Sequence, residues 1–547
     1  MTSAPEVLCV GQPRLTAGLG RMACIDATAF DAVFGKLPRR TSAELIAMAQ
    51  QVDLRGRGGA AFPVARKLAA VARSAHDRKK KPVILVNAAE GEPGSAKDRM
   101  LLLRTPYLVL GGALIAAGAL RTTEILVAVT SEEMASWMRA VVRHSPPLRR
   151  RVQVVQVPNR FVTGEAGALV NAINGKAALP PGRKTRASDS GVRGLPTLLS
   201  NAETFAQLAV LAMLGPEGYA SAGTPAEPGT LLLSVGGCAA RPAVVEVPSG
   251  LPLGRVLDLC DTRPCEGVLV GGYHGMWLPD ETAYDTPVSR AGLEAVGGTL
   301  GAGVVMPLGR GSCPLGEVAR VAAYLAGESS GQCGPCRLGL PGIARSLAAV
   351  TTGSGGLDAL DAARRTAAAV RGRGACAHPD GVSRFVQSAL NVFSDDVAAH
   401  VFHGGCGRPV RGFLPVPSAN GNLRLSLDWT RCRGHGLCER IVPEIMRLDE
   451  QGYPVMLDIP VPPWLERAAR QATSMCPELA LSLVAVDKVD KEPRQPAGQR
   501  YRSLPGPDRK RLVTRTTGDL AVTEDWIAEL TDARGRIQPV RLSRRPR

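Results

Sequence analysis

The chain has 547 residues, of which 45% are hydrophobic, and it is too long for a single core, so we expect several domains. Its net charge of +17 at pH 7 favours acidic or phosphorylated partners. Because no basic stretch is interleaved with aromatic residues, we interpret the charge as solvated, Arg-rich surface and expect no nucleic-acid partner.

The first residues and the lengths of the apolar runs bear on where in the cell the protein is expected. Residues 1–20 lack a basic start followed by an apolar run, so no secretory signal is expected. The longest apolar run, 108–120, is shorter than the roughly 20 residues that a spanning helix needs. We therefore expect a soluble cytoplasmic protein. Its 13 cysteines are then better explained as metal or iron–sulfur ligands than as disulfides, because several stand in C-x-x-C and Cys-Pro settings.

The first half of the chain alternates between strand-like and helix-like segments. A helix is expected over 41–52, followed at 55–67 by the glycine-rich stretch RGRGGAAFPVARK, whose amides can face a phosphate. Such a loop is weak evidence alone, but the apolar run 83–87 then leads into the polar loop AAEGEPGSAKDR, where α/β proteins place ligand sites. Further segments continue the alternation and predict a mainly parallel sheet: a helix over 108–120, strands over 124–130 and 152–157, a loop then helix over 160–175, and a loop then helix from Gly194.

Five motifs in order carry a specific resemblance: RGRGGAAFP, NAAEGEPGSAKDR, TGEA, GLPTLLSNAET and GQCGPCR. Residues 50–400 resemble the NADH-binding flavoprotein subunit (the 51 kDa or F type) of respiratory complex I and of NAD-linked hydrogenases and formate dehydrogenases. The resemblance implies FMN among these loops, NAD(P)H stacked over it and a nearby [4Fe–4S] cluster. It implies FMN contacts from Gly56, Arg57, Gly58, Lys67, Asn87, Glu90, Gly164, Glu165 and Asn201.

The residue chemistry agrees with this assignment. Gly59 completes the glycine-rich loop, and Lys67 supplies a cation. Asn87 and Asn201 carry donors and acceptors suited to flavin polar atoms. Phe62 either covers a ring of the cofactor or packs in the core. Glu165 is the candidate catalytic residue, ordering the flavin or nicotinamide edge.

Four positions depart from the family pattern: Ala89, Ala166, Arg186 and Ser200. Ala166 replaces a second glutamate of the kind that hydrogen-bonds a ribose and repels a 2′-phosphate. With Arg183, Lys184 and Arg186 close in sequence, this loss predicts relaxed discrimination toward NADPH. The alternative is a decayed nucleotide pocket.

The stretch GESSGQCGPCR, residues 327–337, predicts a metal centre. Cys333 and Cys336 form a C-x-x-C, and we interpret Cys376 as a third ligand at helix ends of a bundle over 316–400. The family frame places Ser330 where a fourth cysteine would stand. The cage then holds a [4Fe–4S] cluster through Ser330, a [3Fe–4S] cluster through three cysteines, or a labile cluster.

A second redox module follows at 423–485. Cys432, His435, Cys438 and Cys476-Pro477 form the pattern C-x-x-H-x-x-C…C-P, which resembles small bacterial ferredoxins serving cytochromes P450. Three cysteines suffice for a [3Fe–4S] cluster, whereas a [4Fe–4S] cluster needs His435 or another fourth ligand. Zinc is the competing interpretation, since three cysteines and a histidine also form a zinc set. Cys313 and Cys406 remain unassigned.

The predicted fold is multidomain α/β: a Rossmann-like FMN/NAD(P)H domain, a β-grasp (ubiquitin-like) insert, a helical-bundle iron–sulfur domain, an α+β ferredoxin domain, and a basic, disordered tail with one helix near 522–530. The expected boundaries of these parts are 1–225, 226–310, 311–410, 420–486 and 487–547.

The predicted function is an NAD(P)H dehydrogenase, of the NADH:acceptor or NADH:ferredoxin type, that passes electrons from NAD(P)H through FMN and an iron–sulfur cluster to the fused ferredoxin cluster. The direction of flow stays open, and a non-catalytic electron-relay subunit that has lost nucleotide binding is the alternative. Expected partners are NAD(P)H, an acceptor protein (a P450, a molybdenum enzyme or a membrane redox complex) and a small iron–sulfur subunit. A partner of this kind would hold the chain peripherally at the inner face of the membrane.

Overall fold

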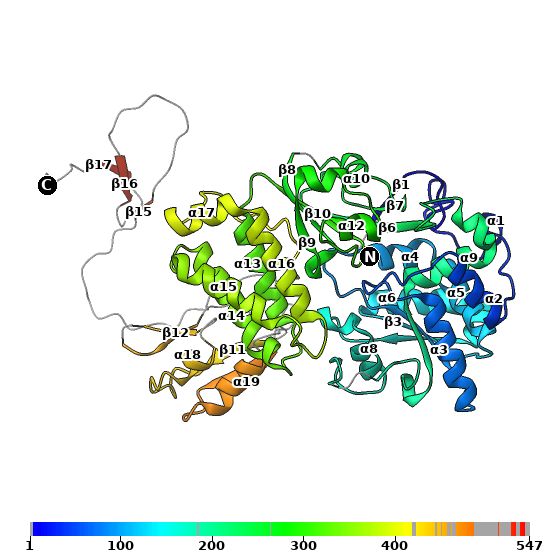
Figure 1. The fold of residues 1–547 in the computed structure, drawn as a ribbon. Helices are drawn as coiled ribbons and strands as arrows, with labels where there is room; N and C mark the ends of the chain where they lie inside the picture. Colours follow the sequence, from blue (N-terminus) through cyan, green and yellow to red (C-terminus); the bar gives the residue numbers. More distant parts are fainter. Residues whose placement is uncertain are drawn as a thin grey trace. The chain divides into compact units, whose positions relative to one another are not determined.

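The computed structural model forms two compact units, Met1–Ala485 and Val486–Arg547, each described by itself (Figure 1). The structure describes residues 4–182, 185–262, 264–417, 423–442, 446–449, 451–456, 461, 466–485, 512–513, 527–531 and 537–541.

A four-stranded parallel sheet, in the order β4-β3-β2-β5, forms the centre of the first domain. Its strands are β2 (Val83–Ala88), β3 (Ile125–Val129), β4 (Val152–Gln156) and β5 (Thr197–Asn201). The expected strands over 83–87, 124–130 and 152–157 are confirmed. The sequence predicts a loop at β5, because its Thr-Leu-Leu-Ser-Asn sequence has polar residues at both ends and no run of β-branched residues, but its pairing with β2 makes it a strand.

Helices cover both faces of this sheet. Side chains of β2 alternate between a large core containing Ile84 and Val86 and a smaller one containing Val83 and Leu85. The expected buried helix is α5, and the helix over 41–52 is α2, whose N-cap is Thr41 within a capping box with Glu44. The helices of this region are α1 (Ala27–Phe34), α2 (Ser42–Gln51), α3 (Val64–Asp77), α4 (Lys97–Arg104), α5 (Pro106–Ala119), α6 (Glu132–Arg143), α7 (Pro146–Arg149), η1 (Phe161–Gly164), α8 (Ala166–Ile173), η2 (Val192–Gly194) and α9 (Ala202–Ala220).

The strand order creates a switch point between β2 and β5. From β2 the chain runs outward through β3 to β4 and then returns to place β5 on the other side of β2. In open parallel sheets, ligands bind outside the carboxyl ends of the strands at such a point. Asn87 and Asn201 are register partners at the ends of these two strands.

The second sheet of the protein is six-stranded and mixed, in the order β1-β7-β6-β10-β8-β9. Five of its strands lie within the insert expected over 226–310, while the β-grasp assignment stays a prediction. β1, at residues placed in the first domain by the sequence, pairs in parallel with β7, while the expected domain boundaries stay predictions. The elements are β1 (Glu6–Cys9), β6 (Thr230–Val235), β7 (Ala243–Pro248), α10 (Leu253–Leu259), β8 (Cys265–Val270), η3 (Gly272–His274), β9 (Met276–Pro279), α11 (Asp280–Asp285), α12 (Arg290–Ala295) and β10 (Val304–Gly309).

A buried carboxylate ties the N-terminal segment to this sheet. Glu246 on β7 is 0% exposed. It accepts hydrogen bonds from the backbone amides of Arg14, Leu15 and Thr16, at 2.9–3.0 Å. The hydroxyls of Thr16 and Thr230 donate to it at 2.6 and 2.7 Å. These donors take the place of the water that an isolated charge would require.

A helical bundle follows the mixed sheet (Figure 1). The bundle expected over 316–400 is present and consists of α13, α14, α15, α16 and α17. Between α13 and α14 lies η4, a π-helical turn that contains Cys336. The bounds are α13 (Pro314–Gly327), η4 (Pro335–Gly339), α14 (Leu340–Thr351), α15 (Gly356–Val370), α16 (His378–Val392) and α17 (Ser394–His403).

The ferredoxin-like region has a core of its own around Leu425, Val442 and Ala469. It contains two antiparallel pairs: β11 (Leu423–Leu427) with β14 (Leu481–Ala485), and β12 (Met446–Leu448) with β13 (Pro454–Met456). Its helices are α18 (Leu437–Ile441) and α19 (Glu466–Met475).

The second unit contains the tail. Its described residues form an antiparallel sheet of β15 (Leu512–Val513), β16 (Ile527–Thr531) and β17 (Ile537–Arg541). The helix expected near 522–530 is wrong for 527–530, which lie in β16. The predicted disorder falls mainly on residues outside the described ones.

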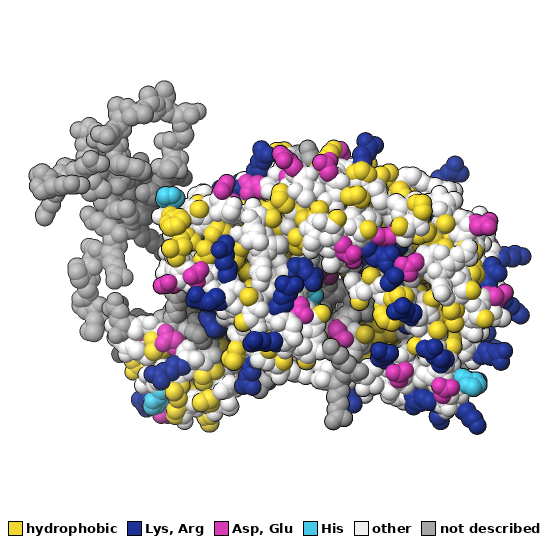
Figure 2. Space-filling view, viewed as in Figure 1, with side chains coloured by type: hydrophobic (Ala, Val, Ile, Leu, Met, Phe, Trp, Pro, Cys, Tyr) yellow, Lys and Arg dark blue, Asp and Glu magenta, His cyan; other side chains and the backbone are white. Residues whose placement is uncertain are grey.

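The surface and helix lengths bear on the charge and membrane expectations. Figure 2 shows Lys and Arg side chains dispersed over this face of the molecule among acidic ones. Among the described residues, no single helix is long and apolar enough to cross a membrane. The helices α4 and α5, which meet at an angle of 93°, are together long and apolar enough for a bent membrane span. Most of α5, however, is buried in the protein core.

Candidate functional site

Four of the five motifs meet at the switch point of the parallel sheet. Asn87 Nδ2 donates to the carbonyl of Gly164 at 3.0 Å, which joins β2 to the TGEA loop. Asn201 Nδ2 donates to Asp98 Oδ2 at 2.5 Å, which joins β5 to the polar loop after β2. A Cβ on Gly58 would lie 3.2 Å from Asn201 Cβ, so the glycine loop approaches this edge closely. Sequence-distant motifs are therefore one structural site.

Lys67 brings a cation to this site without a carboxylate partner. Its Nζ donates to the carbonyl of Leu199 at 2.8 Å and to Ser200 Oγ at 3.4 Å. Burial lowers the pKa of Lys67 to about 8. A buried ammonium bonded only to neutral oxygens favours an anionic neighbour. Thr163 Oγ1, beside Gly164, is buried and has no hydrogen-bond partner. Both observations fit a bound group with anionic and polar atoms, as FMN has.

A buried ion network stabilises the floor of the site. Lys97 Nζ lies 2.9 Å from Asp98 Oδ1 and 3.1 Å from Glu203 Oε2, and all three side chains are buried. Lys97 also donates to Asn201 Oδ1 at 2.9 Å. The sequence places Lys97 and Asp98 within a motif without assigning them a role, and Glu203 was missed. Charged residues within both motifs were the available signal, because buried charges are rare unless they are paired.

Glu90 and Glu165 both cap helices. Glu90 accepts hydrogen bonds from Ser95 Oγ and from the amides of Asp98 and Arg99, at the start of α4. Glu165 is the N-cap of α8 and accepts from the Ala168 amide at 2.8 Å. The Glu165 residue is exposed, as is its neighbour Ala166.

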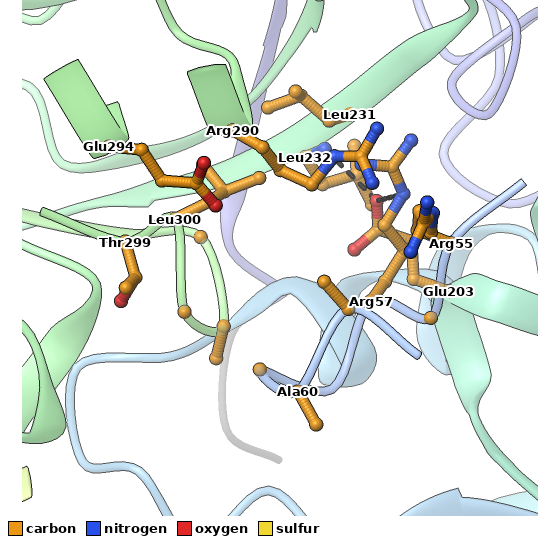
Figure 3. A pocket seen from close by; sticks show the side chains of 16 residues that line it. Arg55, Arg57, Ala60, Glu203, Leu231, Leu232, Arg290, Glu294, Thr299 and Leu300 are labelled. Carbon is orange, nitrogen blue, oxygen red and sulfur yellow. Dashed lines mark hydrogen bonds and ion pairs between the residues drawn. The ribbon is translucent and has the colours of Figure 1, made fainter. Parts of the chain in front are cut away.

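An open cavity of about 200 Å³ lies against the glycine loop (Figure 3). Gly56, Arg57 and Gly59 line it, together with β6 and residues 299–303. Figure 3 shows Arg55, Arg57 and Arg290 gathered near Glu203 at one end. The other predicted flavin contacts do not line this cavity. Phe62 is 49% exposed, with Lys67 Nζ 5.9 Å from its ring centroid, so core packing is wrong for Phe62.

Two of the departures from the family pattern are buried. Ala89 packs in the smaller core of the parallel sheet, and Ser200 accepts from Lys67. Arg186 is exposed. Arg183 and Lys184, which support the NADPH hypothesis, lie outside the described residues.

The cysteines of the predicted metal centre come together in the bundle. The Ser330 hydroxyl donates a hydrogen bond to the Cys336 side chain. Cys336 also shares a side-chain hydrogen bond with Cys333. Cys336 is 2% exposed, and burial raises its pKa to about 11, to which negative charge on the nearby Cys376 adds. The structure thus gathers Ser330, Cys333, Cys336 and Cys376.

Contacts between Phe161, just before the TGEA residues, and His378, just after Cys376, connect this centre to the TGEA loop. Phe161 packs on His378 with ring centroids 5.5 Å apart, and its amide donates to Glu328 Oε2 at 2.8 Å. His378 follows Cys376 closely, and burial lowers its pKa to about 4. Burial first, and then the nearby Glu165 carboxylate, raises the pKa of the Cys376 thiol. The predicted flavin loop and cluster ligands are therefore neighbours.

The predicted ligands of the ferredoxin-like region surround one small cavity. Cys432, His435, Cys438 and Cys476 all line it, and its surface is mostly apolar. Ala480 donates its amide to Cys476 Sγ at 3.4 Å. His435 Nε2 instead lies 3.4 Å from Glu478 Oε1 at a half-exposed position.

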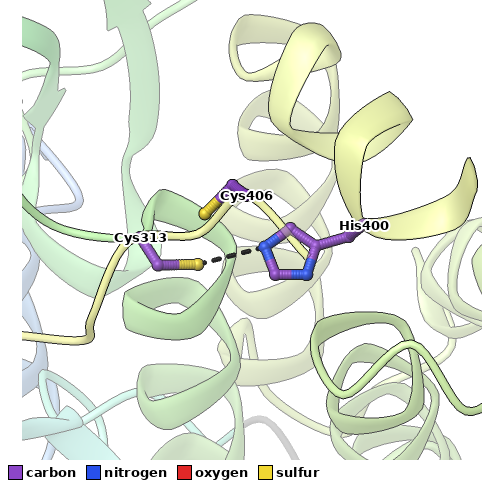
Figure 4. Close-up of side chains that lie close together, drawn as sticks. All are labelled: Cys313, His400 and Cys406. Atoms are coloured by element: carbon purple, nitrogen blue, oxygen red, sulfur yellow. Dashed lines mark hydrogen bonds between the residues drawn. The ribbon is translucent and has the colours of Figure 1, made fainter. Parts of the chain in front are cut away.

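One further cluster of chemical groups is not apparent from the sequence. Among the described residues, only Cys313, His400 and Cys406 bring three ligand atoms within 4.8 Å of one another (Figure 4). No short motif joins all three, because Cys313 lies at the start of α13, 87 positions before His400, which lies on α17 with Cys406 in the loop after it.

Three known protein families match the chain. Residues 49–210 match the Nuo51 FMN-binding domain, 316–400 the NADH-ubiquinone oxidoreductase-F iron–sulfur binding region, and 425–483 a 4Fe-4S single cluster domain. The last match begins after the bundle and covers the predicted ferredoxin-like region. FMN and iron–sulfur domains thus follow one another in the predicted order.

Known relatives agree with these matches. The F-type subunit of the NADH-quinone oxidoreductase of Mycobacterium tuberculosis is 29% identical over 401 residues, 69% of this chain and 88% of the relative. The NADP-reducing hydrogenase subunit HndC of Solidesulfovibrio fructosivorans is 26% identical over 75% of this chain and 84% of the relative. A crystal structure of an air-oxidized NAD+-reducing [NiFe]-hydrogenase superposes with a TM-score of 0.64 and 27% identity, over 73% of this chain and 68% of that one. The chain is thus similar to the F-type subunits of NADH-quinone oxidoreductases and to NAD(P)-reducing hydrogenases, and it matches a 4Fe-4S single cluster domain on the C-terminal side of the shared region.

Proposed function

We propose that the chain is an NAD(P)H-dependent oxidoreductase that passes electrons through FMN and the Cys333/Cys336/Cys376 centre to the ferredoxin-like centre and an external acceptor. The observation that carries this proposal is the contact between the TGEA loop and the cluster segment through Phe161 and His378. Electrons leaving a flavin at the sheet edge would have a short route to the cluster.

The sheet edge would hold FMN through side chains with complementary chemistry. Lys67 would face an anionic atom, because its buried ammonium is bonded only to neutral oxygens. Asn87 and Asn201 would orient the polar edge of the ring, and the glycine loop would admit the cofactor closely. When bound, FMN would supply the conversion between a hydride, which carries two electrons, and one-electron transfer. The same assignment gives contacts to Gly56, Arg57, Gly58, Gly59, Phe62, Glu90, Gly164 and Glu165.

The bundle and the ferredoxin-like region would each hold an iron–sulfur centre. Cys333, Cys336 and Cys376 would supply thiolates in the bundle, with Ser330 as a weaker fourth ligand. Cys432, Cys438 and Cys476 would do so in the second centre, whose apolar cavity fits a cluster better than a hydrated ion. The acceptor would be a P450, a molybdenum enzyme or a membrane redox complex, and NADPH would serve beside NADH.

The test begins with purified full-length protein. We expect a yellow protein with one FMN per chain that bleaches on anaerobic addition of NADH or NADPH, and two iron–sulfur signals on reduction. A preference for NADH above about 100-fold would overturn the NADPH part. Colourless protein with both clusters intact would overturn the dehydrogenase proposal and support an electron-relay subunit, an outcome that Ala89, Ala166 and Arg186 make worth measuring.

A further inference from the structure

We propose that Cys313, His400 and Cys406 form a zinc site, separate from both iron–sulfur centres, that fastens the segment after α17 to the start of α13. Cys313 is the N-cap of α13, His400 lies on α17, and Cys406 follows that helix. Two thiolates and an imidazole are a ligand set that zinc prefers.

The three ligand atoms already have nearly the spacing that a single ion requires. Cys313 Sγ lies 3.2 Å from His400 Nε2 (Figure 4). Around a tetrahedral zinc, sulfur and nitrogen ligands are roughly 3.6 Å apart, and two sulfurs roughly 3.8 Å. All three ligand atoms lie within 4.8 Å of one another, so small side-chain movements would complete the geometry.

Neighbouring groups orient the ligands as second partners do in metal sites. His400 Nδ1 lies 3.1 Å from the carbonyl of Thr351, and a carbonyl only accepts, so Nδ1 carries the proton. The lone pair of Nε2 is therefore directed at Cys313. A ligating histidine typically holds its other nitrogen in this way.

The sulfurs also have partners that favour their negative form. The Gly316 amide donates to Cys313 Sγ at 3.2 Å, at the N-terminus of α13. Arg408 hydrogen-bonds the Cys406 side chain, while its guanidinium pairs with Asp396 and Glu266. Donors and a cation next to thiolates offset the charge that zinc ligation leaves on sulfur.

Burial decides where the fourth position lies. Cys313 and His400 are 3% and 4% exposed, whereas Cys406 is partly exposed. Three protein ligands leave one tetrahedral position, which water would fill on the Cys406 side. The alternative is a neutral thiol donating to the imidazole, since burial raises the pKa of Cys313 to about 11.

The experiment measures zinc and iron in full-length protein purified with zinc present. We expect about one zinc per chain, with a zinc-edge X-ray absorption spectrum showing two sulfurs at about 2.3 Å and one nitrogen at about 2.0 Å. Because that edge is specific for zinc, iron–sulfur clusters do not interfere. Cys406→Ala and His400→Gln should each lower zinc at least about 10-fold while iron is unchanged.

Two controls separate this site from other thiols. Cys260→Ala removes a buried cysteine outside this ligand set and should keep zinc. Cys333→Ala should lose iron and keep zinc. Less than about 0.1 zinc per chain in the unaltered protein, or zinc that follows Cys333 rather than Cys406, would overturn the proposal. If Cys406→Ala also lost iron, His400→Gln, which keeps a donor for Thr351, would decide.

Discussion

The helical bundle contains two groups of cysteines that differ in how the chain assembles them. Ser330, Cys333 and Cys336 lie within one short stretch that Cys376 joins from further along the chain. Cys313, by contrast, lies far in sequence from His400 and Cys406, and these three ligand atoms lie within 4.8 Å of one another. The first group is visible as a motif; the second exists only once α13 and α17 have packed. A sequence therefore reveals local ligands and conceals sites that tertiary structure creates.

Breaking the local site should have the largest effect. Cys336→Ala removes a buried thiol, and we expect loss of that cluster and a fall of more than about 100-fold in electron transfer to a one-electron acceptor. FMN content and its reduction by NAD(P)H should persist, because Cys336 is not among the residues assigned to FMN. Iron analysis, EPR and stopped-flow absorbance measure this, with Cys260→Ala as the control. Unchanged iron would remove Cys336 from the cluster.

The flavin edge is also assembled from distant segments, and Lys67 tests it next. Lys67→Met should weaken FMN binding by about 10- to 100-fold, given the 1.5–3 kcal/mol typical of hydrogen bonds to charged groups. Arg66→Met, on the exposed side of the same helix, should have little effect. Fluorescence titration of FMN measures both, and equal losses would point to general destabilisation instead.

Deprotonation of Lys67 should have opposite effects on the stability of the FMN-free protein and on its affinity for FMN. The pKa of Lys67 is about 8 in the folded protein, below its usual value near 10.5, so the unfolded chain binds more protons between these values. The stability of FMN-free protein should therefore rise from pH 8 to 10. FMN affinity should fall over the same range, as the cation is lost. Lys67→Met should remove both trends; a fall in stability would contradict the assignment.

Substitutions of Ser330 test whether this residue belongs to the bundle cluster, and we expect them to have a smaller effect. Ser330→Cys should raise iron content or shift the EPR signal of the bundle cluster, because a thiolate is a better ligand than a serine oxygen. Ser330→Ala is the matched variant and should lower or leave iron unchanged. No difference among the three proteins would place Ser330 outside the cluster.

His435 should show the smallest effect. Its side chain is 46% exposed and paired with Glu478, so we expect His435→Gln to retain a three-cysteine cluster with its EPR signal nearly unchanged. Glu478→Gln is the control. Loss of the cluster in His435→Gln alone would assign the histidine as a ligand, and stoichiometric zinc without a cluster signal would refute the iron–sulfur assignment.

Much of the fold followed from local pattern. Strands β2 and β3 and the helix α5 have nearly continuous apolar runs, and their burial on both sides explains why the pattern was readable. Strand β4, at the edge of the sheet, was readable from its valines instead, although its two glutamines are exposed. β5 and β1 were missed because neither has a long apolar run of its own, and both become strands by pairing with partners far along the chain. The same limit applies to Lys97 paired with Glu203, and to Cys313 beside His400.

The carboxylate of Glu246 has a practical consequence for dissecting the protein. A shortened chain starting at residue 49, where the FMN-binding family match begins, would lack the amides of Arg14, Leu15 and Thr16 and the strand β1. A fully buried charge would then keep only Thr230 as a donor, at a cost of several kcal/mol. The N-terminal arm and the mixed sheet should consequently fold as one cooperative unit. In the full-length chain, Glu246→Gln is a milder way to weaken the attachment of the N-terminal segment to the mixed sheet.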